Sequence, residues 1–341
     1  MRPHRALLRS FGITVASVLL LLASNTVAAQ SAAPAKPVKV RLAEIYEIDG
    51  AALFDPLFDE RAKKYGIEVE VVPVKRYGDV QLALATGQAD FGVLGFFNVG
   101  TMADNKITNV KLIAGSSTGG QGLILRKGLN AKVKTWKDLE GLKIGVAPNG
   151  GAHNIFRTLA KAKGVDLSKV QQVSFAGMGP EAVQALKTGD IDGLLTWEPS
   201  NARAVVEGIA DYSTLKLEES PTGNANGAVA VNTDFAQKHP DVVLNFVRTL
   251  VETTNYLNGN HEEWIRLSMM KTGVSRPVAT EAIKHCIIHY TMPEEETKAF
   301  MKVMATFGVT KKDYSDVVDS YMDYSYLEKA TGKSRKELGG E

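Results

Sequence analysis

Apolar and polar positions along this chain follow two periods, and segments of the two kinds alternate in a regular order. Short apolar runs predict buried strands, and longer stretches with an apolar residue every three or four positions predict helices. In the first part of the chain the predicted strands are 38–45, 68–74, 91–94 and 111–116, and the predicted helices are 52–65, 78–86 and 97–104. Strands that alternate with helices predict a parallel sheet covered on both faces.

The same alternation restarts after Gly128 and predicts a second sheet. Its predicted elements are a short helix 135–139, strand 143–147, helix 152–163, strand 172–175, helix 180–188 and strand 193–197. A short echo supports two lobes, because Ala-Leu-Ala-Thr-Gly-Gln-Ala-Asp at 83–90 returns as Ala-Leu-Lys-Thr-Gly-Asp-Ile-Asp at 185–192. Both copies combine a helix end, a glycine cap and an aspartate before a buried strand. Chance similarity between two ordinary joints is the alternative, and even then each joint marks one α/β lobe.

The last third of the chain is mostly helical. After a strand at 227–232, helical spacing covers 240–257, 262–270, 276–290, 293–307 and 313–327. Helices without strands do not make a third lobe of the same kind, so we expect them to pack on the first sheet. The predicted fold is α/β and two-lobed, with two sheets flanked by helices. Lobe 1 comprises 38–126 and 225–341, lobe 2 is the insertion 127–224, and extended segments 122–126 and 227–231 form a two-strand hinge.

The N-terminus has the pattern of a secretory signal peptide. Three arginines precede an apolar run at 11–23, and the small residues at 27–29 suit signal peptidase, which predicts cleavage after residue 29. Residues 30–37 then form a linker. The apolar run is shorter than the roughly 20 residues a membrane-spanning helix needs, and no cysteine near the cleavage site offers a lipid attachment point. We therefore expect a periplasmic protein without stable membrane insertion.

Composition narrows the class of protein further. The formal net charge is +2, of which the signal's arginines supply +3, so the exported chain lies near −1 and nucleic acid is not an expected partner. Cys286 is the single cysteine, so no intramolecular disulfide forms, and its apolar surroundings within a helical pattern predict a buried side chain. Without the signal, the 341-residue chain still exceeds the size of about 250 to 300 residues at which single cores stop growing, which favours two lobes.

Two strand ends of lobe 2 carry candidate binding residues. Gly150, Gly151, Ala152 and His153 follow a predicted strand and begin a helix, where unpaired N–H groups attract a ligand. The alternative is a tight turn without a ligand; the stretch lacks the lysine of a phosphate-binding loop.

Trp197 and Glu198 end the last strand of lobe 2. The tryptophan can form a cleft wall, and the carboxylate can accept from an amine or a ring N–H. Alternatively, Trp197 belongs to the core and Glu198 only opens the following helix. The corresponding strand ends of lobe 1 lie at 46–47, 95–98 and 116–120, and we expect them to face the same cleft.

The order of the motifs resembles a known family. Ala-Thr-Gly-Gln-Ala-Asp-Phe-Gly at 85–92, Gly-Gly-Ala-His at 150–153, Met-Gly-Pro-Glu-Ala at 178–182 and Trp-Glu-Pro at 197–199 are similar to the sulfonate, taurine, nitrate and thiamine-precursor group of ABC-transporter periplasmic solute-binding proteins. This resemblance spans about 38–330 and implies a type II periplasmic-binding-protein fold that closes on its ligand and delivers it to an ABC permease and its ATPase. It implies a monomer without cofactor, metal or catalytic residue, and ligand contacts at Tyr46, Glu47, Phe96, Asn98, Ser116, Ser117, Gly150, Gly151, Ala152, His153, Met178, Trp197 and Glu198.

The ligand stays open between several chemical classes. Sulfonate- and taurine-binding members usually carry serine or threonine at the helix start where this chain has Gly150 and Gly151, which leaves fewer donors for an oxyanion. With Phe96, Phe97 and Trp197 nearby, a carboxylate or a flat pyrimidine is as reasonable as a sulfonate or a taurine-like molecule.

Two other function classes stay open beside transport. A periplasmic enzyme on the same fold, for example a dehydratase, needs a cleft carboxylate such as Glu198, and an iron-dependent pyrimidine synthase needs more cysteines than Cys286. A ligand-presenting sensor has no sequence signature. His285 and His289 are spaced for one helix face but lack a metal-binding signature, so we interpret them as ordinary helix residues. We expect a binding protein rather than an enzyme.

Overall fold

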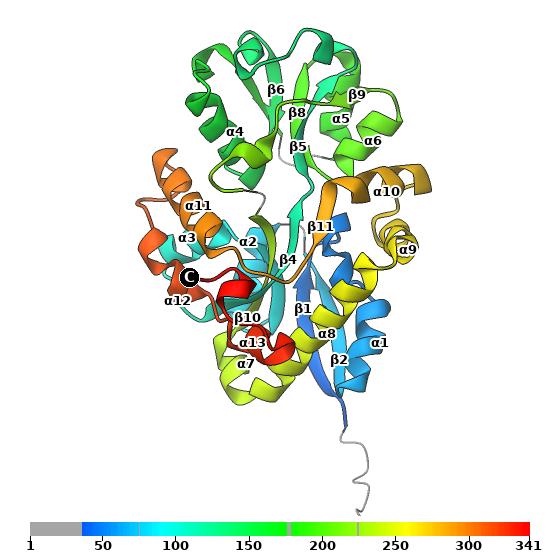
Figure 1. Ribbon diagram of the computed structural model, residues 1–341, viewed down its shortest axis with the longest axis vertical. Coiled ribbons are helices and arrows are strands. Elements are labelled where there is room, and N and C mark those ends of the chain that lie inside the picture. The colour runs from blue at the N-terminus through cyan, green and yellow to red at the C-terminus, as the bar shows by residue number, and fades with distance from the viewer. Residues whose placement is uncertain (1–35, 75, 176–178, 224) are drawn as a thin grey trace, which may run out of the picture. The chain divides into compact units, whose positions relative to one another are not determined.

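Two separate sheets form the framework of the computed structural model, which describes residues 36–74, 76–175, 179–223 and 225–341 (Figure 1). The six-stranded sheet has the order β11-β4-β10-β3-β1-β2. Its strands are β1 (Val38–Glu44), β2 (Ile67–Pro73), β3 (Phe91–Gly95), β4 (Val110–Gly119), β10 (Ala225–Asn232) and β11 (Cys286–Ile288). β1, β2 and β3 run parallel, whereas β10 is antiparallel to β3 and β4, and β11 is antiparallel to β4. The predicted signal peptide and most of the linker lie outside the described residues.

The five-stranded sheet has the order β7-β6-β8-β5-β9. Its strands are β5 (Gln121–Arg126), β6 (Lys143–Val146), β7 (Gln171–Ser174), β8 (Gly193–Trp197) and β9 (Ala210–Tyr212). β6, β7 and β8 are parallel to one another, and β5 is antiparallel to β8 and β9. The expected fold class, two sheets flanked by helices, is confirmed.

Helices cover the faces of both sheets. Those packed around the six-stranded sheet are α1 (Leu57–Lys64), α2 (Tyr77–Ala85), α3 (Asn98–Asp104), α7 (Thr233–Lys238), α8 (Pro240–Asn258), α9 (His261–Thr272), α11 (Glu294–Thr306), α12 (Val318–Tyr321) and α13 (Ser325–Thr331). Those of the five-stranded sheet are α4 (Gly151–Ala162), α5 (Pro180–Thr188) and α6 (Ser200–Val206), whereas α10 (Arg276–Ala282) packs on α9 and on α6. None of the helices described here is long and apolar enough to cross a membrane.

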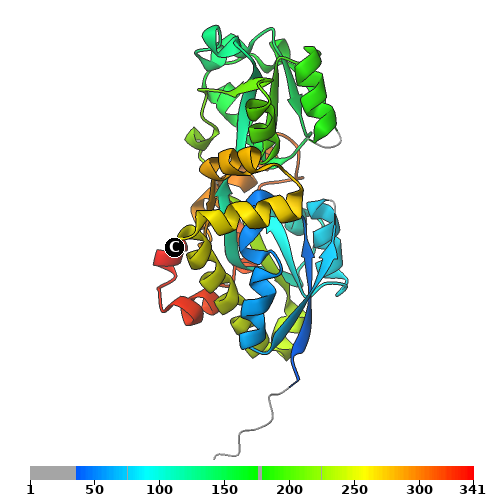
Figure 2. The same cartoon turned by 90° about the vertical axis from the view of Figure 1, so that its right-hand side faces the viewer.

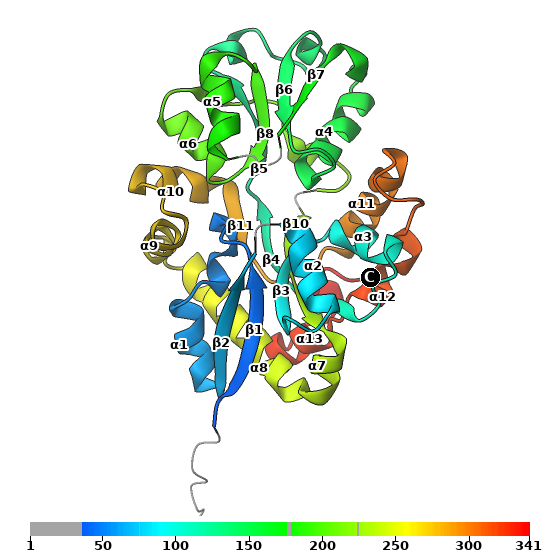
Figure 3. The ribbon, with the colours of Figure 1, turned by 180° about the vertical axis from the view of Figure 1, so that it is seen from behind.

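Side-chain alternation along β3 explains which helices cover the six-stranded sheet. The ring of Phe91 stacks on Phe246 of α8 with centroids 3.9 Å apart, and Phe246 also contacts Phe58 of α1. The next residue, Gly92, faces α2, where a Cβ would lie 2.5 Å from the side chain of Val80. α1 and α8 therefore cover one face of the sheet (Figures 1 and 2), and α2 covers the other (Figure 3).

The chain passes from the six-stranded to the five-stranded sheet at two glycines. β4 ends at Gly119 and β5 begins at Gln121, and both Gly119 and Gly120 adopt positive φ angles of 73° and 75°. Gly120 donates to the His285 carbonyl (2.7 Å) and accepts from the Glu198 amide (2.7 Å). We call residues 119–123 the crossing segment. β5, which begins in the crossing segment, lies wholly in the five-stranded sheet, whereas the sequence pattern predicts that 122–126 connects the lobes. A short apolar strand has the same sequence pattern in either sheet.

The predicted helix 276–290 is wrong in its second half. α10 ends at Ala282, and Cys286–Ile288 forms β11, which pairs with β4 and completes the edge of the six-stranded sheet. The apolar run Cys286-Ile287-Ile288 fits either period, and its pairing with a distant strand decides the outcome. Cys286 is buried as predicted, but in a strand. The predicted helix 313–327 is likewise interrupted between α12 and α13.

Candidate functional site

Strand ends from both sheets meet at the carboxyl group of Glu47, which follows β1. Tyr77, the first residue of α2, donates its hydroxyl to Glu47 Oε2 at 2.9 Å. The side chain of Trp197, at the end of β8 in the other sheet, lies close enough to this carboxyl group to lower its pKa. The Glu47 carboxyl group, which follows a strand of the six-stranded sheet, therefore lies next to an aromatic residue of the five-stranded sheet.

Phe97 and Gly151 mark a second place where the two sheets come close. The ring of Phe97 meets that of Tyr77 edge to face, with centroids 6.1 Å apart. A Cβ placed on Gly151 would lie 3.6 Å from Phe97 Cδ1 and 3.6 Å from Gln121 Oε1. Gln121 in turn pairs directly with Trp197 in the β5–β8 ladder. Glu47, Tyr77, Phe97, Gln121, Gly151 and Trp197 are thus successive neighbours where the two sheets meet, and we call this set the cleft ring.

The start of α4 supplies hydrogen-bond donors to this ring. Gly150 is its N-cap with extended backbone and no side-chain cap, and the first helical bond within the helix runs from the Asn154 amide to the Gly150 carbonyl. The preceding N–H groups of the first turn have no partner in the helix ladder, and the helix dipole gives this end partial positive charge. A ligand acceptor or anionic group at Gly151 therefore meets a favourable field.

Acidic groups dominate the electrostatics on the other side of the ring. Burial, together with the charge of Asp49, raises the pKa of Glu47 to about 8, while Tyr77 and Trp197 lower it. Burial also raises the pKa of Asp49, which accepts from Ser117 Oγ (2.6 Å) and Asn226 Nδ2 (2.9 Å). No lysine or arginine contributes to either shift. The described residues therefore present carboxyl groups to the ring without a compensating cation.

Glu47 makes stability depend on pH with a defined sign. Its pKa is higher in the folded protein than in an unfolded chain, so stability falls as pH rises from about 4.5 to about 8. Glu47→Gln mimics the protonated form, so we expect a flatter profile and a gain on the order of 2 kcal/mol at pH 8.5 relative to the wild type. Thermal unfolding at pH 5.5 and 8.5 measures the difference. Glu60→Gln, at an exposed position of α1, is the control, and equal pH slopes in all three proteins would contradict the assignment.

The sequence-predicted residues of lobe 1 occupy different environments. Glu47 is in the ring, but the ring of Tyr46 packs on Phe54 at 5.6 Å and lies under the Lys271 ammonium. Ser116 and Ser117 are buried in β4, and Ser117 orients Asp49.

In the turn after β3, Phe97 rather than the predicted Phe96 lies at the cleft ring. Phe96 is fully buried in the core. Asn98 is also buried, and its Oδ1 accepts from the Gly95 amide at 2.9 Å, which fixes the turn. Phe97 is consequently the residue that reaches Gly151. The sequence does not distinguish Phe97 from Phe96, because all five residues of β3 are buried and no alternation separates the two faces.

His153 supports the turn before α4. Its Nδ1 accepts from the Asn149 amide at 3.1 Å, and its Nε2 bonds to the Gln172 side chain of β7. Burial lowers the pKa of His153, so the neutral ring suits this role. Ala152 is buried beside it, and Met178 lies outside the described residues. Gly151 is the part of this motif that the structure brings to the ring, and Gly150 precedes it as the N-cap of α4.

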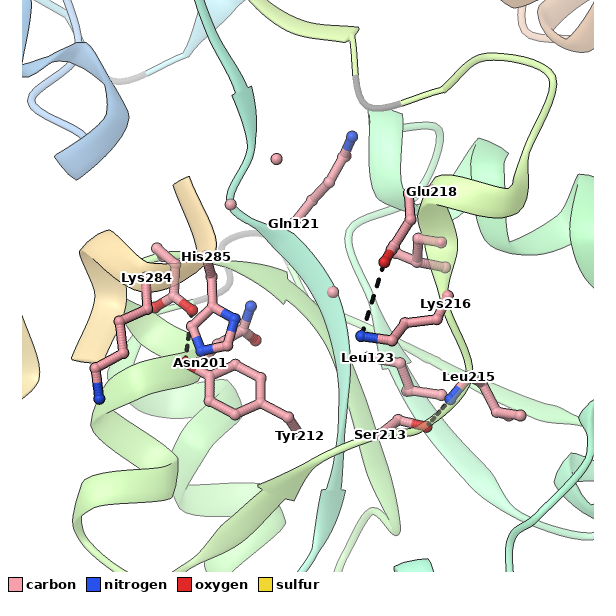
Figure 4. Close-up of a pocket in the computed structure, with 15 residues that line it drawn as sticks. Gln121, Leu123, Asn201, Tyr212, Ser213, Leu215, Lys216, Glu218, Lys284 and His285 are labelled. Atoms are coloured by element: carbon pink, nitrogen blue, oxygen red, sulfur yellow. Dashed lines mark hydrogen bonds and ion pairs between the residues drawn. The ribbon is translucent and has the colours of Figure 1, made fainter. Parts of the chain in front are cut away.

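Glu198 points away from the ring. Successive side chains of a strand face opposite sides, so Glu198 and Trp197 diverge. Glu198 Oε2 accepts from the Ala202 amide in α6 (2.9 Å), Oε1 accepts from the Tyr212 hydroxyl (2.7 Å), and burial raises its pKa to about 7. These bonds agree with the helix-capping alternative. Glu198 also lines a cavity of about 290 Å³ beside β5, shown in Figure 4.

Three ring residues and one supporting residue were absent from the predicted site. Tyr77, Phe97, Gln121 and Asp49 depend on contacts between distant segments, so strand-end reasoning alone does not select them. The sequence signal for Tyr77 is its position directly before the predicted helix 78–86, where an aromatic side chain can contact a ligand.

Comparison with known proteins connects this geometry to a group of relatives. The model of the NMT1-like family matches residues 33–268. The taurine-binding periplasmic protein of Escherichia coli K12 is 25% identical over 208 residues, which cover 60% of this chain and 62% of the relative. The nitrate/nitrite binding protein NrtA of a Nostoc species is 27% identical over 270 residues, covering 70% of this chain and 61% of that protein. Both matches thus span less than two thirds of the relatives' own length.

Solved structures share the fold at lower identity. A putative periplasmic sulfonate-binding protein SsuA from Methylobacillus flagellatus superposes with a TM-score of 0.71 at 20% identity, covering 89% of this chain and 96% of that one. The desulfurization enzyme DszB gives a TM-score of 0.63 at 14% identity, covering 86% and 99%. Both binding proteins and an enzyme therefore use this architecture, and the fold alone does not distinguish them.

Proposed function

The chain belongs to the NMT1-like family, and from that premise we propose that it is the periplasmic solute-binding component of an ABC importer. In this role it captures a small organic solute between the two sheets and passes it to a permease and its ATPase. The names of the two curated relatives, a taurine-binding and a nitrate/nitrite-binding protein, support this role.

The cleft ring is the observation that carries the proposal. Glu47, Tyr77 and Phe97 come from the six-stranded sheet, whereas Gly151 and Trp197 come from the five-stranded sheet. A solute that contacts all of them stabilises the arrangement in which the sheets approach each other, so binding and closure are coupled. Small-angle scattering is expected to show a smaller radius of gyration with bound solute; an unchanged radius at saturation would contradict closure.

The chemistry of the ring favours an amino-bearing solute among the classes that the sequence leaves open. Glu47 accepts hydrogen bonds, the α4 start donates them, and Tyr77, Phe97 and Trp197 supply apolar walls. A molecule with an amino group toward Glu47 and an acceptor or anionic group toward Gly151 satisfies both ends. A bare inorganic anion such as nitrate has no hydrogen-bond donor or positive charge to offer the carboxyl groups of Glu47 and Asp49. Neither carboxyl group has a lysine or arginine among the described groups that shift its pKa.

A thermal-shift panel tests the proposal directly. Taurine, alkanesulfonates, carboxylates, aminopyrimidines and nitrate are compared at equal concentration. A true solute at 100 times its Kd adds about 2.7 kcal/mol, which raises Tm by about 5 °C. We expect amino-bearing compounds to give the shift and nitrate to give none. A shift by nitrate alone, or by no compound, would reject the proposed solute class.

An enzymatic role has less support from the site. The dehydratase alternative depended on Glu198 as a cleft carboxylate, but both of its oxygens accept bonds from α6 and Tyr212 outside the ring. Glu47 is the remaining carboxyl group at the ring, and its neighbours Tyr77 and Trp197 both lower its pKa. Incubation of the protein with the solute selected by the panel, followed by product analysis, distinguishes capture from turnover.

A further inference from the structure

A cavity lies beside the crossing segment, next to the residues that follow β8 and β9. It measures about 290 Å³ and is lined by the crossing segment, by Glu198 and Asn201, by residues 212–213 and 215–218, and by Lys284 and His285. In Figure 4, Tyr212 and His285 lie on one side of β5, and Lys216 and Glu218 lie on the other. Of the cleft ring, only Gln121 also borders this space. We call it the outer cavity.

The buried end of the outer cavity offers hydrogen-bond acceptors that lack donors. Asn201 is 1% exposed, and its Oδ1 has no hydrogen-bond partner among the described residues, while its Nδ2 donates to the Thr196 carbonyl at 3.4 Å. Glu198 is 2% exposed, and each of its oxygens accepts one bond and can accept another. Buried polar atoms in native proteins are nearly always paired, so the free oxygen of Asn201 points to a missing donor.

The charges around this end favour a cationic donor. The charged groups that act on Glu198 are Glu281 and Asp49, both acidic. The nearby cation Lys284 is engaged by Glu281 at 2.7 Å, and Figure 4 shows its side chain extending away from the cavity. Lys216 pairs with Glu218 at the rim at 3.7 Å. An ammonium group therefore meets acceptors at the buried end, and both lysines in the described lining are paired with glutamates.

The walls of the outer cavity belong to both sheets. The Tyr212 ring of β9 stacks on His285, which precedes β11, with centroids 3.9 Å apart. Gly120 is held between the His285 carbonyl and the Glu198 amide. A molecule that touches Asn201 and His285 therefore contacts groups that shift relative to one another when the sheets move.

We propose that the outer cavity is a second binding site, for a small organic amine, and that its occupancy biases the movement of the two sheets. This inference goes beyond the proposed function, because the site is separate from the cleft ring. Binding free energies of coupled sites are reciprocal, so an amine that favours closure also raises the affinity of the ring for its solute.

The binding test uses ethanolamine and 1,4-diaminobutane as probes, measured by titration calorimetry on the exported chain. The calorimetric comparisons are made in a Gly151→Trp background, which fills the cleft ring, so that any amine bound there does not contribute; Asn201→Leu is also titrated alone. We expect saturable binding at one site, weakened about tenfold or more by Asn201→Leu and preserved or tightened by Asn201→Asp. No binding, or equal binding by Asn201→Leu, would overturn the proposal.

A surface variant guards against a fold defect caused by changing buried Asn201. Glu218 is exposed and borders the cavity, so Glu218→Lys places an added cation at the rim and is expected to weaken probe binding at least threefold. Glu219→Lys changes the charge equally at the next residue, which is exposed and lies outside the lining, and is expected to change binding little. Equal effects of both variants would contradict a specific site.

Scattering tests the effect on the two sheets. We expect 1,4-diaminobutane to change the radius of gyration of the wild-type protein and not that of the Asn201→Leu variant, whereas an amine bound at the cleft ring changes both equally. Binding without any change in radius would overturn the bias on movement. Binding in the cleft only, seen as loss of the calorimetric signal in the Gly151→Trp protein and its retention in Asn201→Leu alone, would overturn the site itself while leaving the proposed solute capture standing.

Discussion

Gly151→Trp is expected to abolish solute binding, with a loss of affinity of at least about 100-fold, while the protein remains folded. A Cβ at this position already lies 3.6 Å from both Phe97 Cδ1 and Gln121 Oε1, so an indole fills the space between the ring's walls. It also covers the free N–H groups at the start of α4. Titration with the solute selected by the thermal-shift panel measures the loss, which corresponds to about 2.7 kcal/mol or more.

The matched control is Gly151→Ala. A Cβ contact of 3.6 Å is ordinary van der Waals distance, so the alanine variant is expected to bind within about threefold of the wild type. Gly151 is the first residue of α4 and has no positive φ, so neither substitution strains the backbone. Unchanged far-UV circular dichroism of both variants checks the fold. Full affinity in the tryptophan variant would show that solute binds elsewhere, and the assignment of the cleft ring would fail.

The two-sheet architecture was predictable because its signals are local. Alternating strand and helix periods, a glycine cap before each aspartate at 87–90 and 189–192, and a glycine-rich start of α4 act within a few residues of one another. The pairing of β11 with β4 depends instead on residues more than 150 positions apart. A three-residue strand in an otherwise helical region therefore has no local signal strong enough to reveal it.

Site residues were predictable as strand ends but not as side-chain directions. Glu47 and Gly151 follow strands and Trp197 ends one, and the rule that ligands bind at carboxyl ends of strands selects them. Whether Phe96 or Phe97 faces the cleft depends on the turn that Asn98 fixes. The direction of the Glu198 side chain likewise depends on the positions of its two donors, the Tyr212 hydroxyl and the first turn of α6.

The acidic character of the ring illustrates the same limit. Asp49 lies in a short 3-10 helix (Ile48–Leu53) after Glu47, and its sequence neighbours give no sign that a carboxylate is buried there. Its partners, Ser117 and Asn226, come from β4 and β10, 68 and 177 positions away. The inference that the solute bears an amino group therefore required the three-dimensional arrangement.

Gly119→Ala is expected to destabilise the protein by about 3 kcal/mol or more, the largest stability effect among these variants. Two penalties act together. At φ of 73° a side chain strains the backbone by about 1 to 2 kcal/mol. In addition, the new Cβ would lie 2.7 Å from the His285 carbonyl oxygen, a backbone atom held by its bond from the Gly120 amide. Relief requires the crossing segment to move away from β11, which breaks the β4–β11 pairing at Cys286.

Gly128→Ala separates these two penalties. Gly128 also has a positive φ, 84°, but no atom lies within 4 Å of an added Cβ, so only the backbone strain of about 1 to 2 kcal/mol applies. Denaturant unfolding of both variants gives the comparison. A difference of about 1 kcal/mol or more between them isolates the contact with His285. If the two variants lose equal stability, the His285 carbonyl does not restrict the crossing segment at Gly119. That contact then no longer supports a coupling between the outer cavity and the movement of the sheets.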